Sequence, residues 1–484
     1  MVCQSRVKET MSATTTILMT LIAYKVILLG IGWWASKRVA NESDYFLAGG
    51  GLGSWTAGLS YAASTSSAWV LLGFTGMVFT QGVVGLWLVP GIFAGYCFTW
   101  LVMGPRLNAE TAEKGHITIV DFITAGLSPY YKRIIGLVCA AMIIFCIIFY
   151  VSSQFQAAGN ALNSVFGLSS SKAIILSAVI IVIYCALGGF WAASVTDALQ
   201  AAVMMLACLI VPVVILSAAG GFGSVIETLH TNEHHDYFSF TNGATGMAGI
   251  GLAMGLLGTG LGALGQPQLL NRIMAVRSNQ ERKKAAAITI GWGIVIYTGL
   301  ICLAFSARAL KIETGGESLF FAATEQYLPP VLAGIIVAAV LSAVMSTVDS
   351  LFLAAASAVS HDSGVTYATP QRALLFGRLA MIGVAVLAVI LTLTLPQDIF
   401  KRVLFSWVAL GAAFGPVILV KCLGWRVGER SILYAILVGF FIAVIAYNIP
   451  GPIAEIVEKW VSWAIGLSIL AIGRKRSYDE LAKP

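Results

Sequence analysis

Four oxygen-bearing side chains lie within two helical turns of a long apolar stretch. Residues 341–351 read Leu-Ser-Ala-Val-Met-Ser-Thr-Val-Asp-Ser-Leu, and the four are Ser346, Thr347, Asp349 and Ser350. A carboxylate at membrane depth costs about 2.5–3.5 kcal/mol even on permissive scales, so this cluster needs a partner. Hard oxygen ligands suit a small, hard cation. The cluster therefore predicts that the chain moves a solute together with an ion.

The composition is that of a polytopic membrane protein. The chain has 484 residues, of which 58% are hydrophobic and 11% are charged, with a mean hydropathy of +0.88. A soluble domain carries about 25% charged residues. The net charge of +7 does not indicate nucleic-acid binding, because the basic residues are scattered over short loops. The chain contains no HExxH or GxSxG motif, so we do not expect an enzyme.

Windows of about 20 apolar residues predict an all-α protein with about thirteen transmembrane helices. They fall near 12–35, 52–78, 83–104, 134–163, 171–189, 193–218, 246–271, 285–307, 329–359, 373–394, 398–423, 431–449 and 453–473.

The loop charges predict the orientation. Thirteen spans place most basic residues on one side, from Lys37-Arg38 through Arg272 to Arg474-Lys475-Arg476, whereas the other side carries the acidic segment Glu227–Asp236. The positive-inside rule then puts the C-terminus in the cytoplasm and the N-terminus outside a plasma (inner) membrane.

Two spans are poor helix formers. Residues 53–69 are rich in Gly, Ser and Thr, and residues 258–267 end in Gly-Gln-Pro. Freed backbone groups survive in a membrane only where protein or a water-filled cavity satisfies them. The two spans begin about 195 residues and five spans apart, which is typical of an inverted-repeat transporter with its sites beside both breaks. We therefore divide the chain into 1–51 with a first peripheral span, a repeat at 52–218, an outer loop at 219–245, a second repeat at 246–425, and two peripheral spans with a tail at 426–484.

Five motifs occur in order along the chain. The sequence resembles the sodium:solute symporter family, and most of all its sodium/proline symporter branch. The resemblance implies a leucine-transporter-like core of 5+5 inverted helices and sodium-driven uptake. The motifs are Asp44-Tyr-Phe-Leu-Ala-Gly-Gly with Leu52-Gly-Ser-Trp, Gly188-Gly-Phe-Trp-Ala-Ala-Ser-Val-Thr-Asp197-Ala-Leu-Gln200, Gly262-Ala-Leu-Gly-Gln-Pro-Gln, Ala343-Val-Met-Ser-Thr347, and Gly411-Ala-Ala-Phe-Gly-Pro416.

The resemblance also implies a sodium site between the first broken helix and the polar helix. Its ligands would be Ala63, Ser66, Ala343, Ser346 and Thr347. Five neutral oxygens suit a monovalent ion, whereas a divalent ion would favour carboxylates. The proline branch has an arginine where this chain has Gly50, and an aspartate where it has Thr65. These departures bear on the affinity of coupling more than on coupling itself.

Asp197 admits two interpretations. It follows a Gly-Gly turn and could cap the next helix. The resemblance places it on the cytoplasmic ion path, where it could bind a second sodium with Ser346, Asp349 and Ser350. Asp349 could equally bind a proton or pair with a basic residue.

The solute pocket is assigned by the resemblance as well. Trp69 and Tyr150 match aromatic residues that enclose the solute in the proline branch, but that branch has a tryptophan and a tyrosine where this chain has Thr259 and Ala263. The loss of two rings enlarges the pocket, and Gln154 adds an amide that can donate and accept. The candidate lining residues are Ser67, Trp69, Tyr150, Gln154, Thr259, Ala263, Gln266 and Pro267.

These features predict a sodium-coupled symporter that imports a small polar solute, most plausibly proline or another amino acid, by alternating access. A monocarboxylate, pantothenate or sugar is the alternative solute, and a membrane sensor built on the same fold is a more distant alternative. The expected partners are the solute, sodium and the lipid bilayer, without nucleic acid, and the expected functional unit is a monomer.

Overall fold

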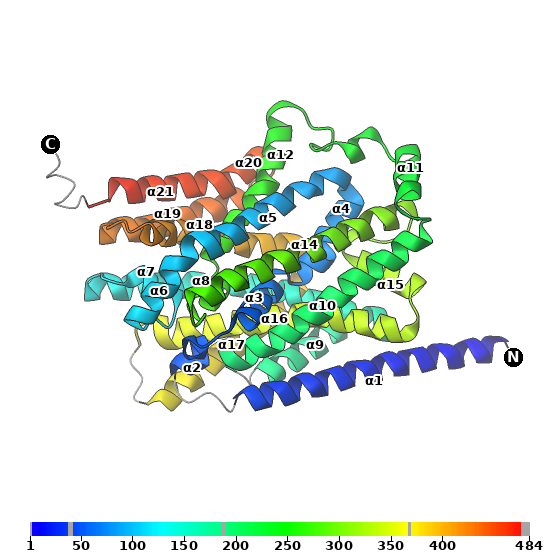
Figure 1. The fold of residues 1–484 in the computed structure, drawn as a ribbon, viewed down its shortest axis with the longest axis horizontal. Helices are drawn as coiled ribbons and strands as arrows, with labels where there is room; N and C mark the ends of the chain where they lie inside the picture. Colours follow the sequence, from blue (N-terminus) through cyan, green and yellow to red (C-terminus); the bar gives the residue numbers. More distant parts are fainter. Residues whose placement is uncertain (1, 37–41, 186–188, 366–368, 476–484) are drawn as a thin grey trace.

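The computed structural model describes residues 2–36, 42–185, 189–365 and 369–475, and every regular element in these ranges is helical. Lys37-Arg38, Gly188 and Arg476 of the predictions lie outside these ranges. Figure 1 shows long helices side by side along the long axis, with α1 (Val2–Ser36) and α21 (Ser462–Ile472) leading to termini at opposite ends. Termini at opposite ends require an odd number of passes, as the sequence predicts.

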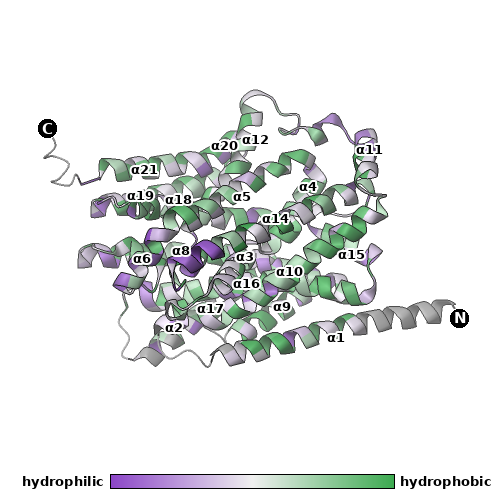
Figure 2. Ribbon diagram, viewed as in Figure 1, coloured by the Kyte–Doolittle hydropathy of each residue, from purple (hydrophilic) through white to green (hydrophobic). Residues whose placement is uncertain are grey.

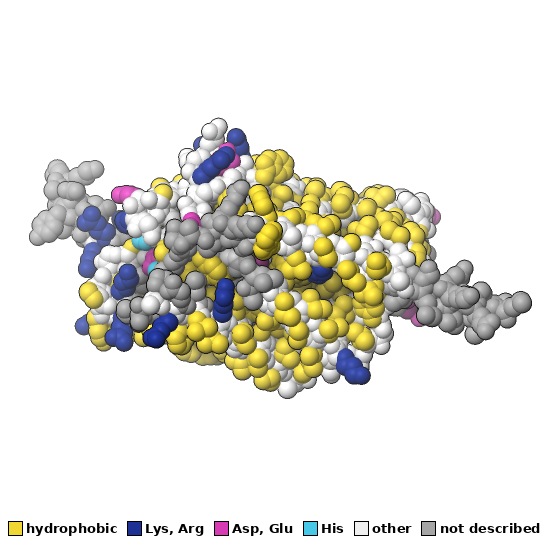
Figure 3. Space-filling model, turned by 90° about the horizontal axis from the view of Figure 1, so that it is seen from below, with side chains coloured by type: hydrophobic (Ala, Val, Ile, Leu, Met, Phe, Trp, Pro, Cys, Tyr) yellow, Lys and Arg dark blue, Asp and Glu magenta, His cyan; other side chains and the backbone are white. Residues whose placement is uncertain are grey.

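Each of the thirteen predicted spans coincides with a helical segment, which confirms the predicted fold class. Among the described residues, ten helical stretches are long and apolar enough to cross a bilayer unaided. The other passes are shorter because they are interrupted or, like Ser170–Cys185, have 16 residues. Figure 2 shows hydrophobic residues along the middle of the helices and hydrophilic ones near α6 and α11. Figure 3 shows Lys and Arg mostly at the end that carries the C-terminus.

The helices that make up the fold follow one another with short connections. The first half contains α2 (Glu42–Leu47), α3 (Ser54–Thr65), η2 (Trp69–Phe74), α4 (Thr75–Gln81), α5 (Leu88–Cys97), α6 (Gly104–Lys114), α7 (Ile119–Thr124), α8 (Pro129–Phe166), α9 (Ser170–Cys185) and α10 (Phe190–Ala218). The second half contains α11 (Phe222–Asn232), α12 (Gly246–Gly258), η6 (Thr259–Gly265), α13 (Pro267–Met274), α14 (Asn279–Ala309), η7 (Gly316–Ser318), α15 (Leu319–Tyr327), α16 (Pro330–Ser357), η8 (Ala358–Asp362), α17 (Pro370–Thr394), α18 (Ile399–Cys422), α19 (Glu429–Tyr447), α20 (Pro452–Ile456) and η9 (Val457–Val461).

Both predicted helix breaks are present. The first lies after α3, where Ser66 leaves helical geometry with φ −99° and ψ 60°. Hydroxyls at residues 64–67 compete for backbone hydrogen bonds and so weaken a helix locally. The second break lies at Gln266, with φ −83° and ψ 112°, before Pro267. Proline lacks an amide hydrogen and therefore starts α13 instead of continuing η6.

Glycines let the second broken helix pass between its neighbours. A Cβ on Gly260 would lie 1.8 Å from the Gly91 carbonyl oxygen of α5. On the other side, a Cβ on Gly262 would lie 1.9 Å from the ring of Trp407, and one on Gly265 would lie 2.4 Å from the Leu410 carbonyl oxygen of α18. Only glycine permits backbones to approach this closely. These three residues bring η6 to the centre of the molecule.

A hydrogen-bonded contact ties α7 to η8, which continues the polar helix α16. His361 Nε2 lies 2.9 Å from Asp121 Oδ2, and the same oxygen accepts the amides of Ile117 and Thr118. Burial alone would raise the pKa of Asp121. The interaction with His361 and the two backbone amides outweighs burial and lowers the pKa from 3.8 to about 2. The carboxylate is therefore held ionised.

Asp121→Asn is expected to lower the free energy of unfolding by about 2 kcal/mol at pH 7, because folding lowers the pKa of this carboxyl from 3.8 to about 2. The contribution is complete above pH 4 and is lost as the pH falls through 2. The Tm of the two proteins in detergent measures it, and the gap at pH 3 should be about half that at pH 7. A gap that stays constant would contradict the assignment.

Candidate ion and solute site

The first break and the polar helix α16 meet through backbone and hydroxyl oxygens. The Ser346 hydroxyl lies 3.4 Å from the Ala63 carbonyl oxygen and 3.2 Å from the Ala343 carbonyl oxygen. The Thr347 hydroxyl lies 2.9 Å from the same Ala343 oxygen. The last amide of the turn, that of Ser66, bonds to Ala62 at 3.0 Å, and α3 ends there. Four of the five predicted sodium ligands therefore form one buried cluster.

This cluster can bind a monovalent cation. Each hydroxyl donates its hydrogen to a carbonyl of its own helix or of the break, so its lone pairs remain free to accept a positive charge. Ser346, Thr347 and Ala63 are fully buried, so no bulk water competes. Ser66, the fifth predicted ligand, adjoins the cluster at the break, and its own buried hydroxyl has no partner among the described residues.

Asp197 forms an ion pair that the sequence reasoning missed. Its Oδ2 lies 3.0 Å from Arg272 Nη2 and accepts the Ser60 hydroxyl at 2.7 Å. Arg272 also donates to Ser60 at 2.9 Å and contacts the hydroxyl of Ser350. The two charged side chains are fully buried. The sequence analysis counted Arg272 among the loop cations, which is wrong: the residue follows Pro267 on α13, and this short helix carries it into the core.

The pair joins four helices at one point. Asp197 comes from α10, Arg272 from α13, Ser60 from α3 and Ser350 from α16, and Ser64 bonds to Ser350 at 3.0 Å. The second carboxylate oxygen of Asp197 is buried without a partner among the described residues. Arg272 and Ser60 thus hold one carboxylate oxygen of Asp197, and the other oxygen lies buried beside them.

Asp349 lies beside this network and makes none of its hydrogen bonds given above. It lines a small cavity of about 80 Å³ beside α1. Leu29, Trp33 and Tyr184 also line that cavity. Of the predicted second-site residues, Asp197 and Ser350 come together through Arg272, and Asp349 lies on a neighbouring face of the helix.

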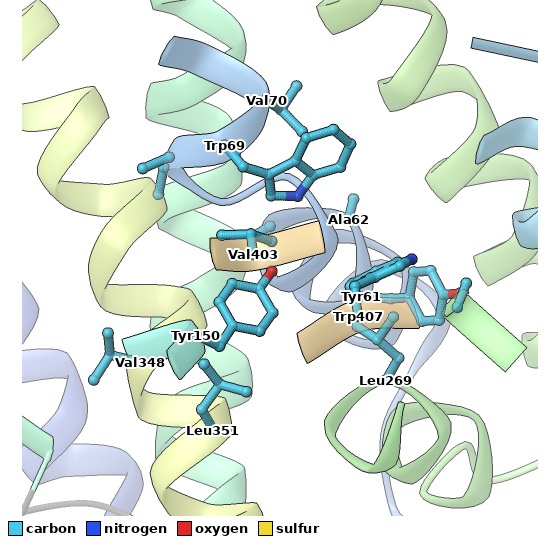
Figure 4. Close-up of a cluster of buried hydrophobic side chains, with 14 of the residues drawn as sticks. Tyr61, Ala62, Trp69, Val70, Tyr150, Leu269, Val348, Leu351, Val403 and Trp407 are labelled. Carbon is cyan, nitrogen blue, oxygen red and sulfur yellow. The ribbon is translucent and has the colours of Figure 1, made fainter. Parts of the chain in front are cut away.

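The first group of solute-pocket residues comes together beside the first break. The Tyr150 hydroxyl of α8 lies 3.4 Å from the Ser67 hydroxyl, and Gln154 Oε1 accepts the Ala68 amide at 3.3 Å. Trp69 donates its indole hydrogen to the Thr65 carbonyl at 3.0 Å. Figure 4 shows Tyr150 with its hydroxyl directed toward the side on which Trp69 lies. These buried residues present two aromatic rings and an amide to one place.

The second group lies on η6 and at its end. The Thr259 hydroxyl is buried without a partner among the described residues, whereas Gln266 donates to the Gly262 and Trp407 carbonyls at 3.1 and 2.9 Å. Gln266 also accepts from Gln268 at 3.0 Å, so its amide already has three partners. The amide of Gln266 is thus engaged within the protein, whereas the Thr259 hydroxyl is not. Ala263 is buried, and Pro267 is the first residue of α13.

Trp407 of α18 was missed by the sequence reasoning. Its indole donates to the Thr259 carbonyl at 2.9 Å, and its ring lies 6.5 Å from that of Trp69. The ring of Phe400, also on α18, lies 6.1 Å from that of Trp69. Trp407 therefore supplies aromatic area next to Gly262 of η6. Figure 4 shows Trp407 in the same buried cluster as Tyr61 and Leu269. A lone tryptophan in an apolar span gives no signal that separates this position from ordinary packing.

A cavity of about 990 Å³, here called the vestibule, opens above these rings at the end of the molecule opposite α21's C-terminus. Its lining includes Gly73 and Phe400, the residues next to Trp69. Trp69 itself is 1% exposed. Trp69 thus contacts the vestibule residue Phe400 with its ring and the break at Thr65 with its indole nitrogen.

Comparisons with known proteins identify the family and the fold. The chain is 32% identical to the osmoregulated proline transporter of Bacillus subtilis, over 87% of each protein. It is 29% identical to the sodium/proline symporter of Escherichia coli, over 96% of this chain and 94% of that one. A Na+-coupled sialic acid symporter solved in a substrate-bound outward-open state shares the fold with a TM-score of 0.79 at 16% identity, over 96% and 99% of the two chains. The profile of the sodium:solute symporter family matches residues 45–439, and the chain belongs to that family.

Proposed function

We propose that this symporter imports proline or another small zwitterionic amino acid, driven by sodium, with its N-terminus outside and its C-terminus in the cytoplasm. The names of the relatives, which are proline transporters, support the solute. The excess of Lys and Arg at the end that carries the C-terminus supports the orientation.

The observation that carries the ion assignment is the contact between Ala63 and Ser346 across the break. We propose that sodium binds among Ala63, Ser66, Ala343, Ser346 and Thr347. Sodium joined to both α3 and α16 would hold the broken helix against the polar helix. That state favours solute binding, because the same break carries Ser67 and Trp69.

The solute then meets neutral groups and rings. Tyr150, Gln154 and Thr259 offer polar atoms, Ala263 offers a small side chain, and Trp69 with Trp407 contributes aromatic rings beside them. A solute carboxylate would bind free backbone amides at the break or the sodium ion itself.

Release requires the opposite end to open. The Asp197–Arg272 pair joins α10 to α13, so opening toward the C-terminal end must separate or reorient this pair. Sodium that leaves the cluster can use the unpartnered oxygen of Asp197 on its way. A second cation, either sodium or a proton, is best placed at Asp349, since Arg272 already neutralises Asp197.

Uptake by the purified protein in proteoliposomes tests the proposal. The panel is proline, other small amino acids, a monocarboxylate, pantothenate and a sugar, each under a sodium, lithium or proton gradient. We expect sodium-driven uptake of an amino acid, with proline foremost. Uptake of a monocarboxylate, pantothenate or sugar without uptake of any amino acid would contradict the proposed solute.

A further inference from the structure

The vestibule carries more acidic than basic groups. Its lining contains four carboxylates and two ammonium groups, and therefore an excess of two negative charges when all are ionised. They are Glu317, Asp398, Glu455 and Glu458, with Lys401 and Lys459.

Each basic group is already engaged by an acid. Lys401 Nζ lies 3.4 Å from Asp398, and Lys459 Nζ lies 3.0 Å from Glu455 and 3.6 Å from Glu458. Glu317 accepts the amides at the start of α18, with the Phe400 nitrogen at 2.9 Å. Both lysines are thus matched by carboxylates, and neither leaves an unopposed positive charge in the lining. Arg402, which adjoins Glu317 and Asp398 behind the lining, offsets part of the remaining negative charge.

Half of these charged residues come from the last pass, which is fixed to the second broken helix. A Cβ on Gly255 of α12 would lie 2.2 Å from the Glu455 carboxylate, and one on Gly258 would lie 2.9 Å from Lys459 Cβ. The Trp460 indole donates to the Met254 carbonyl at 2.8 Å. The peripheral last pass therefore forms a wall of the vestibule and packs closely against α12.

We propose that the vestibule is a charge filter, which concentrates cations before the buried site, admits zwitterions and repels monocarboxylates. A cleft lined by one sign of charge focuses the field and raises the local concentration of the opposite ion. The solute part of this proposal rests on the proposed function, whereas the sodium part stands without it.

Neutralising one acidic and one basic residue of the filter should shift the half-saturating sodium concentration in opposite directions. The side chains of Glu455 and Lys401 are 46% and 73% exposed, so both tolerate glutamine. The half-saturating sodium concentration is measured by intrinsic tryptophan fluorescence of the purified full chain, without solute. At low ionic strength, Glu455→Gln should raise it about twofold and Lys401→Gln should lower it about twofold. Choline chloride at high concentration should abolish both shifts.

Matched controls lie at the opposite end of the molecule. Glu429→Gln and Lys132→Gln change the same charges away from the vestibule and should leave the sodium titration unchanged. Shifts of the same sign in both vestibule variants, no shift in either, or shifts that survive high salt would overturn the filter.

The KM of the solute that the panel identifies, measured in the same two variants, reveals the charge of that solute. A zwitterion has no net charge, so its KM should move less than the sodium value in either variant. For an anionic solute, the KM should shift in the opposite direction to the half-saturating sodium concentration, and it should be lower in Glu455→Gln than in wild type. That result would overturn the zwitterion proposal and leave the cation filter intact, so the two failures are distinguishable.

Discussion

Replacing both Ser346 and Thr347 by alanine is expected to raise the half-saturating sodium concentration of uptake by about tenfold for each hydroxyl removed. A ligand oxygen contributes on the order of 1.4 kcal/mol to binding, which corresponds to a factor of ten. The Ala63 and Ala343 carbonyls remain, but two of five neutral oxygens are lost. Sodium titration of solute uptake in proteoliposomes measures the change.

Ser357→Ala is the matched control for this pair. Ser357 lies on the same helix, is buried, and donates to the Ala354 carbonyl at 3.0 Å, away from the break. Its loss should change neither the sodium dependence nor the maximal uptake. If S346A/T347A and wild type showed equal sodium dependence, the ion-site assignment would be wrong.

Arg272→Met is expected to destabilise the protein by about 3–5 kcal/mol and to abolish sodium-driven uptake. Removing one partner of a fully buried pair leaves an uncompensated carboxylate in the core. The double variant Asp197→Asn/Arg272→Met carries no buried charge at this point. It should recover most of the thermal stability in detergent, while uptake stays low because the cytoplasmic ion path has lost its carboxylate.

Thermal stability and sodium-driven uptake distinguish the structural role of the ion pair from its role in transport. If the double variant were no more stable than Arg272→Met, the pair would not be the source of the stability. If the double variant transported as well as wild type, Asp197 would have no part in the ion path.

The passes and both breaks could be predicted from sequence because their signals are local. About 20 apolar residues define a span, and clustered hydroxyls or Gly-Gln-Pro define a break. The predicted sodium residues also came together, since Ala63 lies at one break and Ser346 in the only comparably polar stretch of α16. Composition and spacing are enough to predict a feature that depends on one segment of the chain.

The partners of Asp197 could be identified only from the three-dimensional structure. Arg272 stands close in sequence to loop cations, and its charge does not reveal that α13 turns inward. The direction of Asp349 follows from helix geometry: relative to Ser346, residue 349 lies about 60° to one side and Ser350 about 40° to the other. Spacing alone could therefore have separated these two, but only the packing shows that Ser350 faces Arg272.

The glycines where η6 crosses α5 and α18 affect how this helix can move. A helix with side chains at its crossings interlocks with its neighbours, and each small displacement forces those side chains into new rotamers. Gly260, Gly262 and Gly265 present bare backbone instead. The segment that we propose lines the solute site can therefore tilt by small amounts with little side-chain rearrangement, within the limit set by its hydrogen bonds to Trp407. At these positions the absence of a side chain both allows small movements of η6 and makes substitution unfavourable.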